Sequence, residues 1–320
     1  MHQDFILHTI PLYIVNYDIS IFLKYNLGDI RQERRLAEDW PGEAAIKCLT
    51  DKASGLFIWA ATACRFIGEG KRFTMKRLST ILQNSTSVIS PEQNLNDIYL
   101  AVLQNSIDGY SESEKQELYE TLRLILGTLV ILFSSLSATS LPKLLYIDQG
   151  NLDQTLADLH SILNIPDERT DPIHLHHPTF RDFFLDKQRC DDPFWVNETE
   201  AHRVLAENCV RLMSDNLKTD ICDVRAPGIH LSEVDSSRIE HHLPAELRYA
   251  SRYWTQHLQQ SKASIQDNDG IYQFLQKHLL HWVEALSLIG CISDGILGLS
   301  ILLSIVKVSY PRAVVYKCSC

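Results

Sequence analysis

Three histidines in the stretch 173–185 have the residue type and spacing that could do chemistry in this chain. His174, His176 and His177 fall in a pattern typical of a short strand that leads directly into a helix. Pro178 suits the first position of that helix, where a missing N–H costs nothing. The helix that follows has one apolar face, formed by Phe180, Phe183, Phe184 and Leu185. The pattern predicts that His177 stands where the strand meets the helix.

The elements that must position His177 are indicated by apolar spacing upstream. Helices are expected over 118–133 and 152–163, with a shorter one over 141–146 between them. Ser111 followed by Glu114 is a capping-box pattern for the first of these helices. A hairpin-like turn over 166–172 precedes the strand. Three helices, a hairpin and a closing helix together predict a winged helix-turn-helix over 111–190.

The segment His177-Pro178-Thr179-Phe180-Arg181-Asp182-Phe183-Phe184 resembles the winged-helix domain of signalling NTPases of the NACHT class, within the STAND group. In that family a histidine at this place reaches the phosphates of bound ADP and helps to hold the closed, inactive state. The resemblance implies a cofactor-binding role in nucleotide-phosphate sensing for His177, provided that a nucleotide-binding core is supplied.

A second stretch, 40–82, resembles the helical domain that follows the nucleotide-binding core in fungal NACHT proteins. The resemblance lies in Trp40-Pro41-Gly42-Glu43, in Gly55-Leu56-Phe57-Ile58-Trp59-Ala60 and in Lys76-Arg77-Leu78. It implies a regulatory role in non-self recognition, heterokaryon incompatibility or programmed cell death, processes related to innate immunity. It also implies protein partners, among them NACHT/STAND paralogues.

The predicted fold class is all-α, mostly helical, with a small β wing in the winged helix and a possible stray N-terminal strand at Phe5-Ile6-Leu7. Asp18 is expected to cap the first helix. Five segments are expected along the chain. They are 1–39, a remnant C-terminal edge of a nucleotide-binding core; 40–108, a helical domain; 111–190, the winged helix; 191–290, a helical linker domain; and 291–320, a divergent hydrophobic tail.

Nucleotide hydrolysis is not expected of this chain. A P-loop needs Gly-x-x-x-x-Gly-Lys-Ser/Thr after a strand, because backbone N–H groups and one lysine wrap the phosphates. The one Gly-Lys pair, Gly70-Lys71, is followed by Arg72, lacks the earlier glycine and comes after a helical pattern. No apolar strand ends in paired acids either. We therefore expect a non-enzyme with no cofactor of its own, whereas ADP or ATP serves the intact family.

Metal binding is also not expected. Alternation along a strand sends His174 and His176 to one face and His177 to the other. His278, His281 and Glu284 recur at every third residue of a predicted helix, so successive side chains rotate away from one another. A hydrogen-bonded, half-buried helix face is the expectation for these three.

Charge argues against nucleic acid as a partner. Winged helices often bind DNA, yet residues 111–187 hold six Lys and Arg against twelve Asp and Glu, and the chain carries a formal charge of −10. Phosphate contact needs a surplus of basic side chains. The same balance argues against binding to an anionic membrane surface.

Eight scattered cysteines, most of them inside apolar helical patterns, indicate reduced thiols and a cytoplasmic location. The apolar run 296–306 is expected to be a buried helix rather than a membrane span. Two alternatives to the role of a non-catalytic NACHT relay stay open: a trans-acting module that binds full-length relatives, and a tail-anchored membrane protein held by 296–306.

Overall fold

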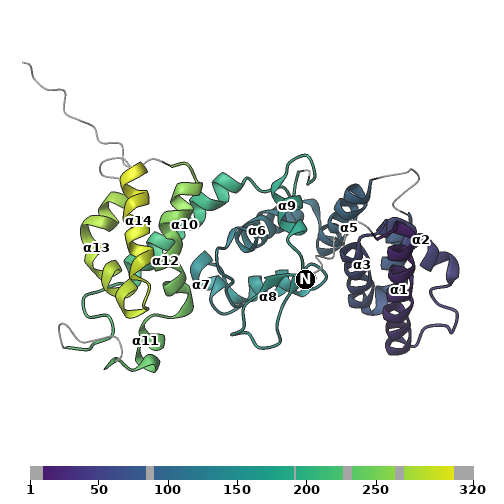
Figure 1. Cartoon of the computed structure of the whole chain (residues 1–320), viewed down its shortest axis with the longest axis horizontal. Helices are drawn as coiled ribbons and strands as arrows, with labels where there is room; N and C mark the ends of the chain where they lie inside the picture. The colour runs from purple at the N-terminus through teal and green to yellow at the C-terminus, as the bar shows by residue number, and fades with distance from the viewer. Residues whose placement is uncertain (1–9, 84–89, 191, 226–232, 264–269, 306–320) are drawn as a thin grey trace, which may run out of the picture. The chain divides into compact units, whose positions relative to one another are not determined.

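A computed structural model of the chain describes residues 10–83, 90–190, 192–225, 233–263 and 270–305. Within these residues the protein is mostly α-helical and has one two-stranded sheet (Figure 1). The expected all-α class with a small β hairpin is thereby confirmed. The possible strand at Phe5-Ile6-Leu7 lies outside the described residues. Backbone contacts divide the chain into two compact units: unit 1 holds 1–130 with 149–196, and unit 2 holds 131–148 with 197–320.

Unit 1 begins with a group of packed helices. They are α1 (Leu12–Arg34), α2 (Glu43–Ala53), α3 (Phe57–Glu69), the short 3-10 helix η2 (Lys71–Phe73), α4 (Thr74–Gln83) and α5 (Pro91–Ser106). Helix α1 packs on α2 and α3, and α5 packs on α2 and α3. Helix α3 is apolar on most of its circumference and is buried at seven of its thirteen positions.

The N-terminus of α5 shows how local sequence determines a helix start. The side chain of Ser90 accepts a hydrogen bond from the backbone N–H of Gln93, and Pro91 occupies the first turn. Behind this cap the apolar stripe of α5 is buried, and it consists of Leu95, Ile98, Tyr99, Val102 and Leu103.

The rest of unit 1 contains the region around His177. Its helices are α6 (Glu112–Ile131, part of this unit through Val130), α8 (Gln149–Ala157) and α9 (Thr179–Leu185). Between α8 and α9, strands β1 (Leu163–Asn164) and β2 (His174–Leu175) pair antiparallel, with Leu163 opposite Leu175. The capping-box pair at the start of α6 forms: the backbone N–H of Ser111 donates to the Glu114 carboxylate at 2.7 Å.

Unit 2 is a helical bundle. It contains α7 (Leu141–Leu145), α10 (Glu198–Asn216), α11 (Ser236–His242), α12 (Ala245–Gln260), α13 (Gly270–Leu288) and α14 (Ile292–Ile305). Helix α12 packs against α7, α10, α13 and α14 and so forms the centre of this bundle. At its core the rings of Trp254 and Trp282 meet edge to face with centroids 5.5 Å apart.

Two expected element boundaries are wrong. Asp18 does not cap the first helix, because α1 already begins at Leu12, directly after Pro11. The helix expected over 152–163 ends at Ala157, and two tight turns then lead into β1, with Leu159 N bonded to Leu156 O and Ile162 N bonded to Leu159 O. Leu163 pairs with Leu175 in the sheet, so the end of the expected helix forms a strand instead.

The two units do not follow the five predicted segments. Residues 131–148, which include α7, belong to unit 2, whereas α8, the hairpin and α9 belong to unit 1. The elements expected between 111 and 190 occur in the expected order. The winged-helix arrangement and the five boundaries stay predictions.

Candidate functional site

His177 lies between β2 and α9, as the sequence predicts. Its side chain is half-buried, and its Nδ1 atom lies 2.9 Å from Thr179 Oγ1 and 3.2 Å from the backbone N of Thr179. The imidazole is therefore held on one side by the first residue of α9.

A relay of hydrogen bonds extends from His177 into the helical core of unit 1. Thr179 Oγ1 lies 2.8 Å from the hydroxyl of Tyr99 on α5, a side chain that is only 1% exposed. The Tyr99 ring meets that of Phe180 edge to face at 5.2 Å. Burial is the main cause that raises the pKa of Tyr99, so this hydroxyl keeps its proton. Helix α5 thus fixes the start of α9.

The relay determines which nitrogen of His177 carries the proton. A backbone N–H can only donate, so the bond from Thr179 N requires Nδ1 to be the acceptor. The neutral ring must then carry its proton on Nε2. His177 consequently offers an N–H donor on the side away from Thr179, and such a donor suits a phosphate oxygen.

Helix α9 is anchored by its aromatic face. Phe180, Phe183 and Phe184 are buried, as predicted, and Leu185 is half-buried. On the other side of the helix, the guanidinium of Arg181 donates to the backbone carbonyl of Val130 at 3.0 Å. These contacts hold the helix that positions Thr179.

A half-buried charged cluster, which the sequence analysis did not predict, joins α3 to the segment before β1. Arg65 Nε donates to the carbonyl of Ser161 at 3.1 Å, and Ser161 Oγ donates to Glu69 Oε2 at 2.9 Å. Arg77 on α4 lies 3.8 Å from the same carboxylate oxygen. Burial is the main cause that raises the pKa of Glu69 to about 7, although Ser161 and Arg77 oppose it. The signal was available as Arg65 and Glu69, spaced four residues apart on an apolar helix.

The other two histidines of the stretch do not join His177. His176 Nε2 lies 2.9 Å from the carbonyl of His160, and His174 lies on β2, exposed. Across the residues that the structure describes, no three His, Cys, Asp or Glu side chains come together as a metal site.

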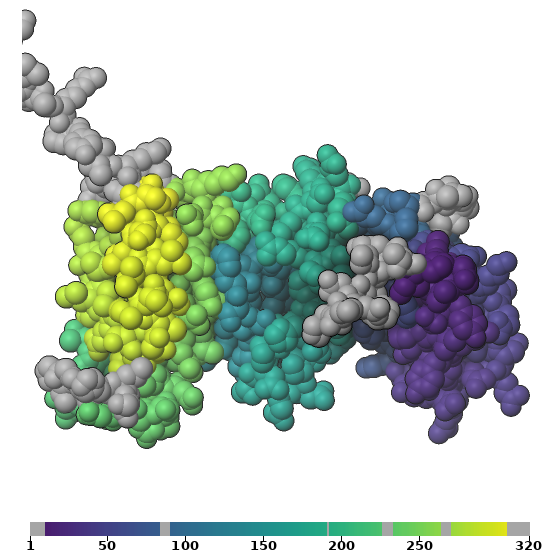
Figure 2. Space-filling view, viewed as in Figure 1, coloured from purple at the N-terminus to yellow at the C-terminus, as the bar shows by residue number. Residues whose placement is uncertain are grey.

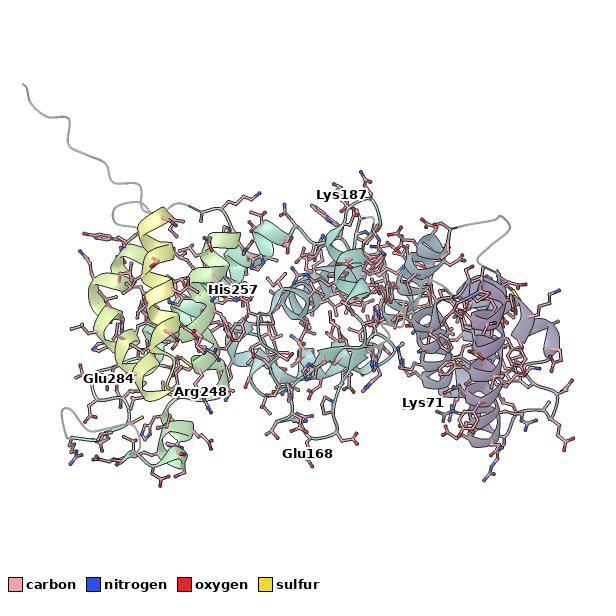
Figure 3. All side chains as sticks on the ribbon, viewed as in Figure 1. Lys71, Glu168, Lys187, Arg248, His257 and Glu284 are labelled. Atoms are coloured by element: carbon pink, nitrogen blue, oxygen red, sulfur yellow. The ribbon has the colours of Figure 1, made fainter. Side chains whose placement is uncertain are left out.

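The pair Gly70-Lys71 lies at a turn between two helical segments. Lys71 follows the end of α3 and begins η2 with a φ of 44° (Lys71 is labelled in Figure 3). A helix rather than a strand precedes the pair, as the sequence predicted.

Unit 2 holds a second buried polar cluster that sequence reasoning missed. His202 Nδ1 lies 2.7 Å from His257 Nδ1, and His257 Nε2 lies 2.7 Å from the Tyr249 hydroxyl (His257 is labelled in Figure 3). The backbone N–H of Phe133 donates to Tyr249 Oη at 3.3 Å. Burial, and after it the neighbouring His202, lowers the pKa of His257 to about 3.

One order of donors satisfies every member of this cluster. Tyr249 donates to His257 Nε2, and His257 then donates from Nδ1 to His202 Nδ1. The remaining proton of His202 is on Nε2, 4.0 Å from the carboxylate of Glu198. Both rings are neutral in this arrangement, and the cluster ties α10, α12 and the segment before α7 together.

Of the three residues expected to form a polar face on α13, His281 and Glu284 form hydrogen bonds as expected, whereas His278 is buried rather than half-buried. His281 Nε2 lies 3.0 Å from Thr219 Oγ1. The carboxylate of Glu284 accepts the backbone N–H groups of Asp220 and Ile221, at 3.3 and 3.1 Å.

The geometry defines a class first: a mostly α-helical protein in which a histidine with a fixed tautomer stands between a β hairpin and an aromatic helix. The chain is similar to the vegetative incompatibility protein HET-E-1 of Podospora anserina, with 25% identity over 274 residues. That match covers 78% of this chain and 19% of HET-E-1, so the chain spans about a fifth of the length of this curated relative. No family model and no solved structure matches the chain.

The similarity to HET-E-1 fits a distant relation to fungal incompatibility proteins. Helix α14, which covers most of the apolar run 296–306, has 14 residues. Among the described helices, none has both the length and the apolar character that crossing a bilayer requires.

Proposed function

We propose that this chain is a non-catalytic relay of a NACHT/STAND-type nucleotide switch, in which His177 reports the presence of a nucleotide phosphate to the helices behind it. The observation that carries the proposal is the hydrogen bond from Thr179 N to His177 Nδ1. It leaves the Nε2–H of a half-buried ring as the donor. Similarity to a vegetative incompatibility protein supports the biological setting.

The path of the relay follows from the contacts behind His177. Displacement of the imidazole by a phosphate would pull on Thr179, and Thr179 is bonded to Tyr99 on α5. Tyr99 packs on both Phe180 and Phe183. A movement of His177 would therefore be transmitted through Thr179 to both α5 and α9, which are far apart in the sequence.

We propose further that the chain hydrolyses no nucleotide by itself and acts through a protein that carries a P-loop. Its own Gly70-Lys71 pair lies at a helical turn, where the backbone cannot form a phosphate-binding loop after a strand. A paralogue with an intact nucleotide-binding core is the partner that would complete the site.

The test is capture of a full-length, ADP-binding NACHT protein by the immobilised 320-residue chain, with ADP, with ATP and without nucleotide. We expect capture that depends on ADP and falls about tenfold in the His177→Ala variant, because one hydrogen bond from the neutral imidazole to a charged phosphate is lost. His174→Ala, on the exposed strand position nearby, is the matched control and should leave capture unchanged. Equal capture by both variants, or micromolar ADP binding to the isolated chain, would refute the proposal.

A further inference from the structure

Helix α1 has one face that is docked in unit 1. The helix packs on α2 and α3, and Phe22 meets the Phe57 ring of α3 edge to face with centroids 6.0 Å apart. The buried residues of α1 are Ile19, Leu23, Leu27 and Ile30. These contacts fix which side of the helix faces away from the core. Figure 2 shows α1 in dark purple at the surface of its unit.

The opposite face of α1 is apolar and exposed. Ile14, Tyr17, Ile21 and Tyr25 are 38%, 66%, 48% and 69% exposed. At about 100° per residue, their spacing of three, four and four places all four within a sector of roughly 80°. Exposed tyrosines that line up along one helix face are typical of surfaces that bind another protein.

The same face continues to Gly28, one turn after Tyr25, and the five residues together form what we call the α1 stripe. A Cβ atom added at Gly28 would have nothing within 4 Å, so the stripe has free space at this end. Ile14 gives the other end a bulky side chain. Both residues lie seven positions from Ile21, which makes Ile21 the centre of the stripe. A two-fold axis at Ile21 would therefore place Ile14 of one copy against Gly28 of a second copy.

Charge at the edges of the α1 stripe is complementary in the same antiparallel order. Asp18 lies on one edge and Lys24 on the other, and both are exposed. The two-fold axis brings Asp18 beside Tyr25 of the second copy, where the tyrosine hydroxyl can donate to the carboxylate. It brings Lys24 beside the ring of Tyr17 of the second copy, a favourable position for a cation. Like charges do not meet in this arrangement. Lys24 keeps its exposed ion pair with Glu43, at 2.9 Å.

We propose that the α1 stripe binds the same stripe of a second copy of this chain, in antiparallel order about a two-fold axis at Ile21. A contact of this symmetry needs one surface that complements itself. The α1 stripe meets this requirement, because the bulky end faces the open end and each edge charge faces a tyrosine. The absence of a side chain at Gly28 lets the two helices approach closely.

The size of the stripe determines how strong this contact can be. With Tyr13, which is 74% exposed at its edge, three tyrosines and two isoleucines offer roughly 500 Å² per copy. The pair would then bury about 1,000 Å² in total, the lower limit for a specific interface. We therefore expect a reversible dimer with a dissociation constant in the micromolar range.

The test is sedimentation velocity of the full chain at concentrations from about 1 to about 100 µM, without nucleotide. We expect the wild type to pass from monomer to dimer over this range. The variants Ile21→Lys and Ile21→Glu should each associate at least about tenfold more weakly, because the axis brings two like charges together. An equimolar mixture of the two variants should dimerise again, because lysine then meets glutamate. This rescue distinguishes a second copy of the chain from any other partner, and it shows that both variants are folded.

A control variant and a crosslinking experiment complete the test. Phe73→Lys adds the same charge at an exposed apolar residue of unit 1 outside the α1 stripe and should leave association unchanged. A mixture of the Ile14→Cys and Gly28→Cys variants, treated with an oxidant, should form more disulfide-linked dimer than either variant alone. A wild type that stays monomeric throughout, a mixture of the Ile21 variants that fails to dimerise, or crosslinking that does not increase in the mixture would overturn the proposal. These outcomes are independent of His177.

Discussion

The buried imidazole of His257 makes the stability of unit 2 depend on pH. The side chain is completely buried, and its two nitrogens contact His202 and Tyr249. Burial is the first cause that lowers its pKa to about 3, and His202 is the second. In the unfolded chain the pKa of this histidine is the ordinary value of about 6.5. Protons therefore bind the unfolded chain more tightly than the folded one.

The sign and size of the effect follow from this difference. A base with a lowered folded-state pKa contributes its full stability above pH 6.5 and loses it as pH falls from 6.5 towards 3. At pH 5.5 the unfolded ring is about ten-elevenths protonated and the folded ring hardly at all. Unit 2 should then be about 1.4 kcal/mol less stable than at pH 7.5 on account of His257 alone.

The assay is unfolding in urea at pH 7.5 and 5.5, followed by fluorine NMR of 5-fluorotryptophan at Trp254 and Trp282, both buried in unit 2. The His257→Gln variant should lose about 1.4 kcal/mol less than the wild type over this pH range. His174→Gln, an exposed histidine in unit 1, is the control and should follow the wild type. The reasoning fails if the wild type and His257→Gln show the same pH dependence, or if the His257 ring titrates near pH 6.5.

Three further predictions concern single side chains. The free energy of unfolding of Glu69→Gln, measured in urea, should rise by about 2 kcal/mol relative to that of the wild type between pH 5 and pH 8. The reason is that a carboxyl whose folded-state pKa is raised to about 7 makes the wild type less stable as pH rises from 4.5 through 7. A difference between the two proteins that stays constant with pH would contradict this. Gly298→Val should lower stability by about 1–3 kcal/mol in thermal unfolding, because the added side chain meets the Trp282 ring. Gly28→Ala is the control, since its added Cβ has nothing within 4 Å, and it should raise stability by about 0.5–1 kcal/mol. Equal effects of the two variants would contradict the packing of α14. Tyr99→Phe should lower stability by about 1 kcal/mol, because the hydrogen bond to Thr179 is lost. The ¹⁵N shifts of the His177 nitrogens should stay typical of a ring with its proton on Nε2, since Thr179 N still donates to Nδ1. A switch to the other tautomer would contradict the relay.

Local signals in the sequence were sufficient to predict several helix starts and buried helix faces. Ser111 with Glu114 caps the helix that it was expected to cap, and Ser90 with Pro91 caps α5 in the same local manner. Such caps involve residues three apart, so the pattern contains the whole interaction. Asp18 failed as a cap because α1 runs on through it, with exposed residues such as Tyr13 in its first turns that give no apolar period.

Contacts between distant parts of the chain could not be read in the same way. His177 was placed correctly by its neighbours, but its link to Tyr99 through Thr179 joins residues 80 positions apart. The contact between His202 and His257 spans 55 positions, and two histidines inside amphipathic helices look like any half-buried pair. Only the packing of the helices decides that these rings meet.

The allocation of residues 131–148 to unit 2 has a consequence for dissecting the protein. The polypeptide passes from one unit to the other three times, near residues 130, 148 and 196. A fragment that stops at 196 would therefore retain α7 without α10 and α12, the helices that cover Leu141 and Leu144. We expect such a fragment to expose an apolar leucine surface and to aggregate, so no single truncation point leaves both units intact.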